Sequence, residues 1–384
     1  MSRRRSPREP STPSDSTTPS VHVLSLRKKI AFSFVSVVAV FAFVELALRL
    51  ARVGEPPTVG VMRFGYDTGI PIFDSDGIEY EGEPFRDVPL FEADLTLFWK
   101  PIANTPFTGT EGLRLPTPES KQKGADVYRI AIVGDSCSFL GEDLYPNRFA
   151  RLAEQETGRK IEVVNASCPG YTSLQGRRRL RNVWPWQPDL IVVYCGWNDH
   201  WKSLNGQTDR DLVERQLLSD NAKSWMGKSR LVWSLYSLRI KLTPPVPIHR
   251  SPVRVPPEDY RANLQQILGE VEQQGCKVVF VTAPSAFLDG QMPPWAFSFF
   301  GQIYQMSPND VAGIPQTHER YNDIVREVAG SSSSAFLLDV AGEWSEPSQV
   351  ERHIELFRGD RIHLQETGHQ EIAEQLFELW KEIP

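Results

Sequence analysis

The sequence has few cysteines, and their spacing excludes the common zinc frameworks. None of the four thiols belongs to a C-x-x-C pair, so no metal site is expected. Disulfide pairing between neighbouring strand ends and small buried thiols are both compatible with their positions. The cysteines are Cys137, Cys168, Cys195 and Cys276.

Positive charge is scarce outside the N-terminus. The chain has a net charge of −6, and its first 29 residues carry seven basic and two acidic side chains, which leaves −11 on the remainder. An acidic body argues against nucleic acid as a partner, because binding to phosphates needs a cationic face. Residues 1–29 also lack large apolar side chains before Val21, which predicts a disordered basic leader.

One long hydrophobic run, Ile30 to Leu50, follows this leader. Its only charges, Glu45 and Arg49, are four positions apart, so they can pair on one helix face. The run is long enough to cross a bilayer and has no polar stripe, which favours a transmembrane helix at 30–50 over a buried core helix.

The flanks of the run predict its orientation. Basic residues 27–29 precede it, so the positive-inside rule places the N-terminus in the cytoplasm and the body outside it. A cleaved signal peptide is the alternative, with Val40 and Ala42 at a candidate cleavage site, but apolar sequence continues past them. We expect a single-pass protein with a periplasmic or cell-surface body.

The body divides into two parts by pattern. Residues 54–125 are rich in proline and glycine without a sustained period, which predicts a membrane-proximal segment with a few strands, packed on the next domain. Residues 126–384 form that domain, with insertions at 200–257 and 284–314. The first insertion contains a predicted helix, Ser229 to Leu242. The second is rich in aromatic residues, which fits an acyl pocket, a membrane contact or a small local core.

From Tyr128 onward, short apolar runs alternate with helical stretches. Alternation of strands and helices, with strands that are apolar throughout, predicts an α/β domain whose parallel sheet is covered on both faces. The predicted strands are Tyr128–Val133, Ile161–Val164, Leu190–Tyr194, Val278–Thr282 and Ala335–Val340. The predicted helices are Tyr145–Glu156, Leu174–Val183, Glu258–Gln273, His318–Val328 and Glu366–Lys381.

Polar residues follow several of these strands, where parallel sheets place their ligand sites. The first strand leads into G-D-S with Asp135 and Ser136, the second into Asn165 and Gly170, and the third into Asn198 and Asp199. The sequence G-D-R-I-H, with Asp360 and His363, precedes the last helix. Each motif is common by itself, but the occurrence of all four in this order is uncommon.

Together these residues suit acyl transfer. A serine hydroxyl becomes nucleophilic when an imidazole takes its proton, provided that the other ring nitrogen is held by an acceptor. His363 is the predicted base for Ser136, and Asp360 is its predicted partner. His200, His369 and His353 are weaker candidates, because His363 alone has an acid at a suitable offset in a loop. The G-x-S-x-G elbow of the α/β-hydrolases is absent.

The oxyanion of such a reaction needs fixed donors. We expect them to be the backbone N–H groups of Ser136 and Gly170 and the side-chain amide of Asn198. Gly170 suits this role because its missing side chain allows close approach. Supporting roles, through hydrogen bonds to backbone N–H groups, are expected for Asp135, Asp199 and Asn165.

These four blocks resemble the SGNH, or GDSL, hydrolase superfamily over about residues 128–384. The resemblance implies a three-layer α/β/α sandwich with a flavodoxin-like five-stranded parallel sheet, and an esterase that forms a serine acyl-enzyme without a cofactor. Two departures are Cys137 after the nucleophile and Ser167, where many relatives have glycine. The anchor followed by a proline-rich segment is similar to membrane-tethered bacterial members.

The expected partner is an acyl-ester substrate, which the predicted location suggests to be an acylated polysaccharide or lipid, acetyl esters included. An O-acyltransferase with the same triad and a non-catalytic binding protein on the same fold remain alternatives. The sequence leaves acyl chain length, oligomeric state and the redox state of the cysteines open.

Overall fold

The computed structural model describes residues 25–56, 58–59, 91–203, 206–214, 218–242, 251–286, 297, 306–345, 352–358 and 362–384. The chain has two compact units, Met1–Val53 and Gly54–Pro384.

The first unit contains the helix α1 (Leu26–Leu50). Its 25 residues span about 37 Å at the usual helical rise, which exceeds the roughly 30 Å of bilayer hydrocarbon. Among the described residues, α1 is the one helix long and apolar enough to cross a membrane. Glu45 and Arg49 form the predicted ion pair, at 2.7 Å between Oε1 and Nη2.

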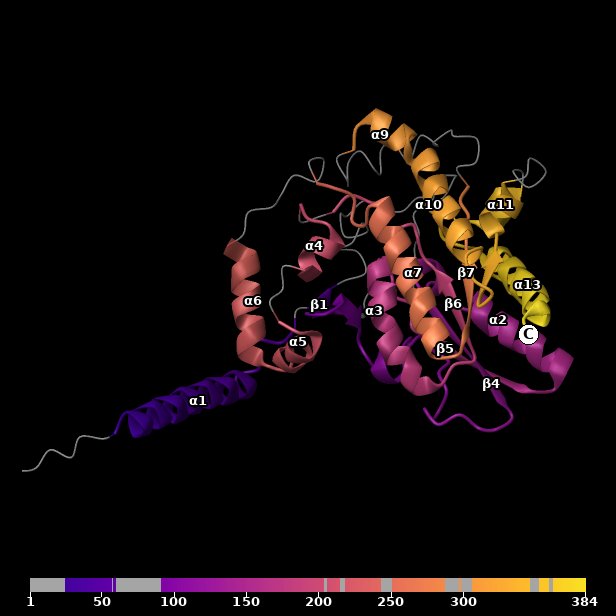
Figure 1. The fold of residues 1–384 in the computed structure, drawn as a ribbon. Helices are drawn as coiled ribbons and strands as arrows, with labels where there is room; N and C mark the ends of the chain where they lie inside the picture. Colours follow the sequence, from indigo (N-terminus) through magenta and orange to yellow (C-terminus); the bar gives the residue numbers. More distant parts are fainter. Residues whose placement is uncertain are drawn as a thin grey trace, which may run out of the picture. The chain divides into compact units, whose positions relative to one another are not determined.

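The second unit is built on a five-stranded parallel sheet with the order β5-β4-β6-β7-β8 (Figure 1). The predicted α/β class and flavodoxin-like sheet are confirmed. Because β4 comes first along the chain but lies second in the sheet, the strand order reverses between β4 and β6. Ligands of such sheets bind at this switch point, beyond the carboxyl ends of the strands. The strands are β4 (Val127–Gly134), β5 (Lys160–Asn165), β6 (Leu190–Tyr194), β7 (Lys277–Val281) and β8 (Ala335–Leu338).

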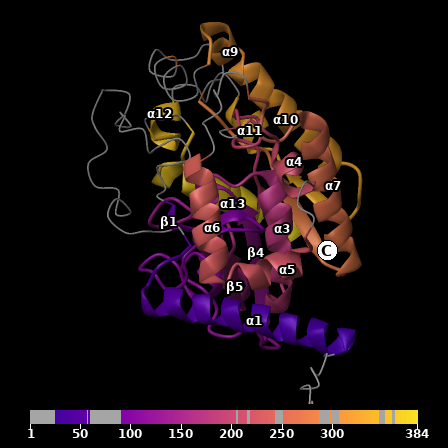
Figure 2. The same cartoon turned by 90° about the vertical axis from the view of Figure 1, so that its left-hand side faces the viewer.

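Helices cover both faces of the sheet (Figures 1 and 2). Ile130 and Ile132 of β4 pack in the same core as α2 and α13, whereas Ala131 and Val133 pack with α3, α7 and α10. Alternate residues of one strand are therefore buried on opposite faces, which explains why the strands are apolar throughout. These helices are α2 (Tyr145–Thr157), α3 (Ser173–Val183), α7 (Pro257–Gln273), α10 (Ile314–Ala329) and α13 (Glu366–Glu382).

A second, antiparallel sheet comes from residues 54–125, with the order β1-β2-β3. Its turn is held by Asp94, whose Oδ1 accepts hydrogen bonds from the backbone N–H groups of Thr96 and Leu97. The hairpin packs against Phe139 and Tyr171, which follow β4 and β5 of the main sheet. Its strands are β1 (Thr58–Val59), β2 (Phe91–Asp94) and β3 (Phe98–Pro101).

The insertion at 200–257 contains three short helices among its described residues, of which the last matches the predicted one. In the insertion at 284–314 the structure describes α9 near its end, and most of its aromatic residues lie outside the described residues, so their role stays a prediction. The bounds of the proposed segments likewise stay predictions. The additional helices are α4 (Asp209–Glu214), α5 (Asp220–Met226), α6 (Arg230–Leu242), α9 (Pro308–Ala312), α11 (Val340–Trp344) and α12 (His353–Leu356).

Two predicted bounds in the second unit differ from the structure by more than one residue. The strand β8 ends at Leu338, not at Val340, because Asp339 caps α11 by accepting a hydrogen bond from the N–H of Gly342. The helix α10 begins at Ile314 rather than His318, with Pro315 in its first turn, where a missing N–H costs nothing.

Candidate active site

Ser136 stands directly beyond β4, on the 3-10 turn η3 (Ser136–Ser138). A side chain at Gly134 would place its Cβ 2.7 Å from the carbonyl oxygen of Tyr194, so only glycine lets β4 end this close to β6. Asp135 caps the turn, because its Oδ1 accepts the N–H of Cys137 at 2.9 Å. The local sequence thus directs the serine to the switch point of the sheet.

His363 lies beside Ser136, although 227 positions separate them. Its Nε2 is 2.7 Å from Ser136 Oγ, a normal hydrogen-bond distance. Both residues are buried, with 4% and 8% of their surfaces exposed. The histidine comes from the loop before α13, where its carbonyl oxygen accepts the N–H of Arg358. Asp360, the predicted partner of the imidazole, lies outside the described residues.

Gly170 occupies a tight turn after β5. The N–H of Tyr171 donates to the carbonyl of Cys168 at 3.1 Å, and the turn has proline at its second position and glycine at its third. Gly170 has a φ of 78°, which together with Pro169 is typical of a type II turn. A side chain would strain this backbone, so glycine is favoured here by conformation.

Two residues from distant segments hold the turn. The indole Nε1 of Trp99, in β3, donates to the carbonyl oxygen of Pro169 at 3.1 Å. The Nη1 of Arg254 donates to the carbonyl oxygen of Gly170 at 2.7 Å, and its guanidinium lies 5.3 Å from the Trp99 ring centroid. The Tyr171 hydroxyl donates back to the Trp99 carbonyl at 2.9 Å. The peptide planes on both sides of Gly170 are therefore fixed.

The backbone N–H groups of Ser136 and Gly170 both remain available. Within the part of the chain that the structure describes, neither donates to a protein acceptor. Backbone N–H groups that have no protein acceptor can donate to a ligand, so this pair suits an anionic ligand atom.

Asn198 follows β6 and is already engaged. Its Nδ2 donates to the carbonyl oxygen of Tyr171 at 3.1 Å and to Oδ2 of Asp135 at 3.3 Å. The amide therefore ties the Gly170 turn to the residue before Ser136. Asn198 thus connects the segments that follow β4, β5 and β6. Both hydrogens of its amide already have acceptors.

The carboxyl groups of Asp135 and Asp199 are fully buried. Burial raises the pKa of Asp135 to about 6 and the pKa of Asp199 to about 7, although hydrogen bonds from Cys137 and Ser173, respectively, oppose the rise. Asp199 accepts the backbone N–H of Ser173 at 2.9 Å and its hydroxyl at 2.6 Å. These hydrogen bonds hold the loop after β6 against the start of α3. Asn165 ties the loop after β5 to the turn after β4, because it accepts the N–H of Ser167 at 3.1 Å and donates to the carbonyl oxygen of Ser138 at 2.8 Å.

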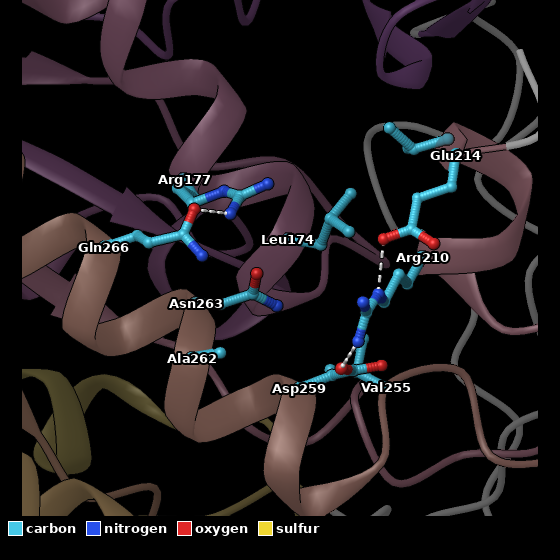
Figure 3. A pocket seen from close by; sticks show the side chains of 10 residues that line it. Leu174, Arg177, Arg210, Glu214, Val255, Asp259, Ala262, Asn263 and Gln266 are labelled. Atoms are coloured by element: carbon cyan, nitrogen blue, oxygen red, sulfur yellow. Dashed lines mark hydrogen bonds and ion pairs between the residues drawn. The ribbon is translucent and has the colours of Figure 1, made fainter.

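The hydroxyl of Ser173, which Asp199 holds, also contacts a residue that lines a nearby pocket. This pocket has a volume of about 220 Å³ and is lined by α3, α4 and α7 (Figure 3). Asn263 lines this pocket and donates to the Ser173 hydroxyl at 3.0 Å. Arg210 also lines the pocket. Its guanidinium donates hydrogen bonds to the carboxylates of Glu214 and Asp259, whose negative charges offset its positive charge. The lining includes neither Ser136 nor His363.

The other histidines have different surroundings. His200 Nε2 lies 3.0 Å from His318 Nδ1. His369 meets the Tyr145 N–H and the Leu140 carbonyl, and burial lowers its pKa to about 3. The third alternative base is His353, whose Nε2 lies 3.3 Å from the main-chain carbonyl oxygen of the last residue of α11. None of these contacts involves Ser136.

None of the four cysteines forms a disulfide, and all four are buried. Burial raises the pKa of the Cys195 thiol well above its ordinary range, and it also raises the pKa of Cys168 and Cys276. Cys137 Sγ lies 3.7 Å from the carbonyl oxygen of Ile362, so this departure from the family pattern contacts the residue before His363.

Sequence reasoning missed Trp99 and Arg254. Trp99 stands in L-F-W-K-P and Arg254 in S-P-V-R-V-P, and neither stretch carries a pattern that points to a site. Both act through contacts made 70 or more positions away, which only the tertiary structure brings together.

One known protein family matches this sequence. The sequence profile of the GDSL-like Lipase/Acylhydrolase family covers residues 132–371. No curated protein matches the chain.

Several solved structures are similar in shape. A lipase/acylhydrolase from Enterococcus faecalis is 16% identical, with a TM-score of 0.40, over 66% of this chain and 96% of its own. LAE5, an alpha/beta hydrolase from the metagenome of Lake Arreo, is 19% identical, with a TM-score of 0.43, over 67% and 96%. An acetylxylan esterase from Geobacillus stearothermophilus is 16% identical, with a TM-score of 0.42, over 68% and 96%.

The family profile runs from the strand that precedes Ser136 into the helix that follows His363, and it spans more than half of the chain. The chain therefore belongs to the GDSL-like lipase/acylhydrolase family, the SGNH hydrolases, and is a carboxylic ester hydrolase.

Proposed function

We propose that the protein is a serine esterase that cleaves O-acyl esters through an acyl-enzyme on Ser136. The observation that carries this proposal is the 2.7 Å distance between His363 Nε2 and Ser136 Oγ. A neutral imidazole at that distance can take the hydroxyl proton as the oxygen attacks an acyl carbonyl.

The reaction then proceeds in two balanced halves. The Ser136 Oγ–carbon bond forms while the hydroxyl proton passes to His363 Nε2, and collapse of the tetrahedral intermediate returns that proton to the leaving alcohol. Water repeats the sequence on the acyl-enzyme and releases the carboxylic acid. We assign to Asp360 the acceptor for Nδ1–H of the imidazole, which keeps Nε2 free to act as base.

We assign the oxyanion to the N–H groups of Ser136 and Gly170, with Asn198 as a third donor. The two backbone groups have no acceptor among the described residues, and this supports the assignment. For Asn198 to contribute, the 3.3 Å bond to Asp135 has to give way, since it is the longer of its two. Asp135 and Asp199 support the loops and do not touch the substrate.

We also propose that α1 anchors the enzyme in a membrane, with the N-terminus in the cytoplasm and the body in the periplasm or at the cell surface. The length of α1 and the basic residues before it support this placement. Acetyl or other acyl esters on a polysaccharide or lipid outside the cytoplasm are the substrates that fit such a location.

Labelling of the purified full chain with a fluorophosphonate probe, together with hydrolysis of p-nitrophenyl acetate, tests the proposal. Ser136→Ala should abolish both signals. Ser167→Ala is the matched control, because its buried hydroxyl has no hydrogen-bond partner among the described residues. An unlabelled wild-type chain, or labelling that survives Ser136→Ala, would refute the mechanism.

A further inference from the structure

The helix α6 presents its leucines to solvent. Leu235, Leu238 and Leu242 are 58%, 52% and 74% exposed, and their spacing puts them on one face. Ser234 and Ser237 on other faces are only half-exposed. A helix that met water alone would show the opposite arrangement, so the exposed face is suited to an apolar environment.

Aromatic residues extend this apolar surface. Trp225, in the preceding helix α5, is 75% exposed, and Tyr236 is 36% exposed. The two helices are joined by the buried Trp233, whose Nε1 donates to the carbonyl oxygen of Gly227 at 2.8 Å. The leucines and Trp225 are thus displayed by one α5–α6 hairpin, residues 219–242. Tryptophan and tyrosine are the residues that favour the boundary between lipid and water.

The hairpin is basic although the body is acidic. Residues 219–242 contain five basic side chains and one acidic side chain, a net charge of +4, whereas residues 30–384 together carry −11. Arg239 and Lys241 lie exposed in the last turn of α6, beside the leucine face. Leucines flanked by cations are typical of helices that lie on an anionic lipid surface.

The start of α6 is tied to the chain just after the apolar helix. Glu55 forms an ion pair with Arg230, at 2.8 Å, and a Cβ on Gly54 would lie 2.3 Å from the Arg230 carbonyl oxygen. Three residues, 51–53, connect this point to the end of α1 at Leu50. Four Cα steps reach at most about 15 Å. A membrane that contains α1 is therefore within reach of α6.

We propose that the α5–α6 hairpin lies on the surface of the membrane that α1 crosses, with its leucines among the lipid chains and its basic residues at anionic headgroups. The proposal rests on the membrane anchor of the proposed function. A second copy of the chain is a poorer occupant, because a two-fold contact would place the exposed cations Lys228, Arg239 and Lys241 against the same residues of the other copy. Two attachments, one spanning and one superficial, would restrict how the catalytic body turns above the lipid.

The test uses the full chain with a single reporter. Leu238→Cys is labelled with the environment-sensitive dye NBD, which is selective because all four native cysteines are buried. The labelled protein is reconstituted into vesicles of phosphatidylcholine and phosphatidylglycerol. Glu378→Cys is the control position, since its side chain is 67% exposed on α13. An unmutated chain taken through the same labelling measures the background.

We expect the Leu238 label to emit at shorter wavelength than the Glu378 label and to lose about half its intensity when the lipids carry a shallow spin-label quencher, as expected for side chains about 5–10 Å deep. Leu242→Cys should behave like Leu238→Cys, and far-ultraviolet circular dichroism checks that each variant is folded.

Water-like emission from both leucine positions would overturn the proposal. A blue shift that lipid quenchers leave unchanged would mean that protein covers the hairpin, as in a dimer, and would also overturn it. Failure of the unlabelled chain to float with vesicles would instead refute the anchor itself. The esterase assignment stands apart from all three results, because activity is measured on a soluble ester.

Discussion

The indole of Trp99 holds the carbonyl oxygen of Pro169 at 3.1 Å. In a trans peptide the carbonyl and the N–H of the next residue point in opposite directions, so this bond also sets the direction of the Gly170 N–H. A residue of the β2–β3 hairpin therefore orients a proposed oxyanion donor.

Trp99→Phe keeps the ring but removes the hydrogen-bond donor. We expect kcat on p-nitrophenyl acetate to fall about tenfold, equivalent to about 1.4 kcal/mol, because a loosened donor stabilises the transition state less. KM should change little. Steady-state kinetics measure both.

Trp344→Phe is the control for Trp99→Phe, since the buried Trp344 indole has no hydrogen-bond partner among the described residues. Its kcat should stay near that of the wild type. Equal losses in both variants would point to general loosening of the fold, and an unchanged kcat in Trp99→Phe would exclude a positioning role.

Asn198→Ala tests the side-chain donor. We expect kcat to fall by up to about a hundredfold, at the lower limit for an oxyanion donor, because the amide is shared with Asp135 and Tyr171. Asn165→Ala, which removes an amide bonded to the backbone of Ser138 and Ser167, should lower the free energy of unfolding more than kcat. The reverse ranking would contradict the assignment.

Arg254 joins Gly170 to the buried carboxylate of Asp209, 2.9 Å from its Nη2. Arg254→Met leaves that charge without its cation and should lower the free energy of unfolding by about 3 kcal/mol. Adding Asp209→Asn should recover part of the loss, because the variant no longer buries an unpaired charge. Urea denaturation gives the values.

Arg210→Met is the comparison for Arg254→Met, because Arg210 is 57% exposed in its ion pair with Glu214. Exposed pairs contribute about 0–1 kcal/mol. A loss at Arg254 no larger than this would mean that its ion pair with Asp209 contributes little to stability.

His369 predicts a pH effect on stability. Its folded pKa of about 3 is depressed by burial below the ordinary 6.5, so its contribution is complete above pH 6.5 and is lost as pH falls towards 3. Between pH 7 and pH 5 this costs about 2 kcal/mol. His369→Gln, which cannot titrate, should therefore lose less stability over that range. Parallel stability curves for the two proteins would contradict the prediction.

The cysteines give a direct chemical count. Because all four are buried and none forms a disulfide, a thiol reagent such as DTNB should find almost none in the native protein and four after unfolding without reductant. Two fewer thiols in the unfolded protein would reveal a disulfide.

The regular core was predictable because its signals are local. Strands buried on both faces are continuous apolar runs, and β6 was found at its predicted bounds, Leu190 to Tyr194. Boundaries that depend on one residue were harder to predict. Asp339 caps α11 and so ends β8 inside the segment predicted as a strand. Pro315 lies in the first turn of α10, which begins before the predicted start of that helix.

The candidate site was predictable where its residues lie in sequence motifs that occur in a recognisable order. Ser136 and His363 follow recognisable motifs and do meet in space. Trp99 and Arg254, which hold the Gly170 turn, do not lie in any such motif. Each donates a hydrogen bond to a loop that is distant from it in sequence, so only the tertiary structure reveals the contact.

The β2–β3 hairpin sets a practical limit on how the enzyme can be shortened. Family likeness starts at residue 132, which invites a cut near residue 126. Such a cut would remove the carbonyl groups of Thr96 and Leu97 that receive hydrogen bonds from Arg178 and Gln175 of α3. The trimmed protein would keep Ser136 and His363 yet uncover the Tyr171 ring, so poor activity in it would say nothing against the chemistry proposed for the intact chain.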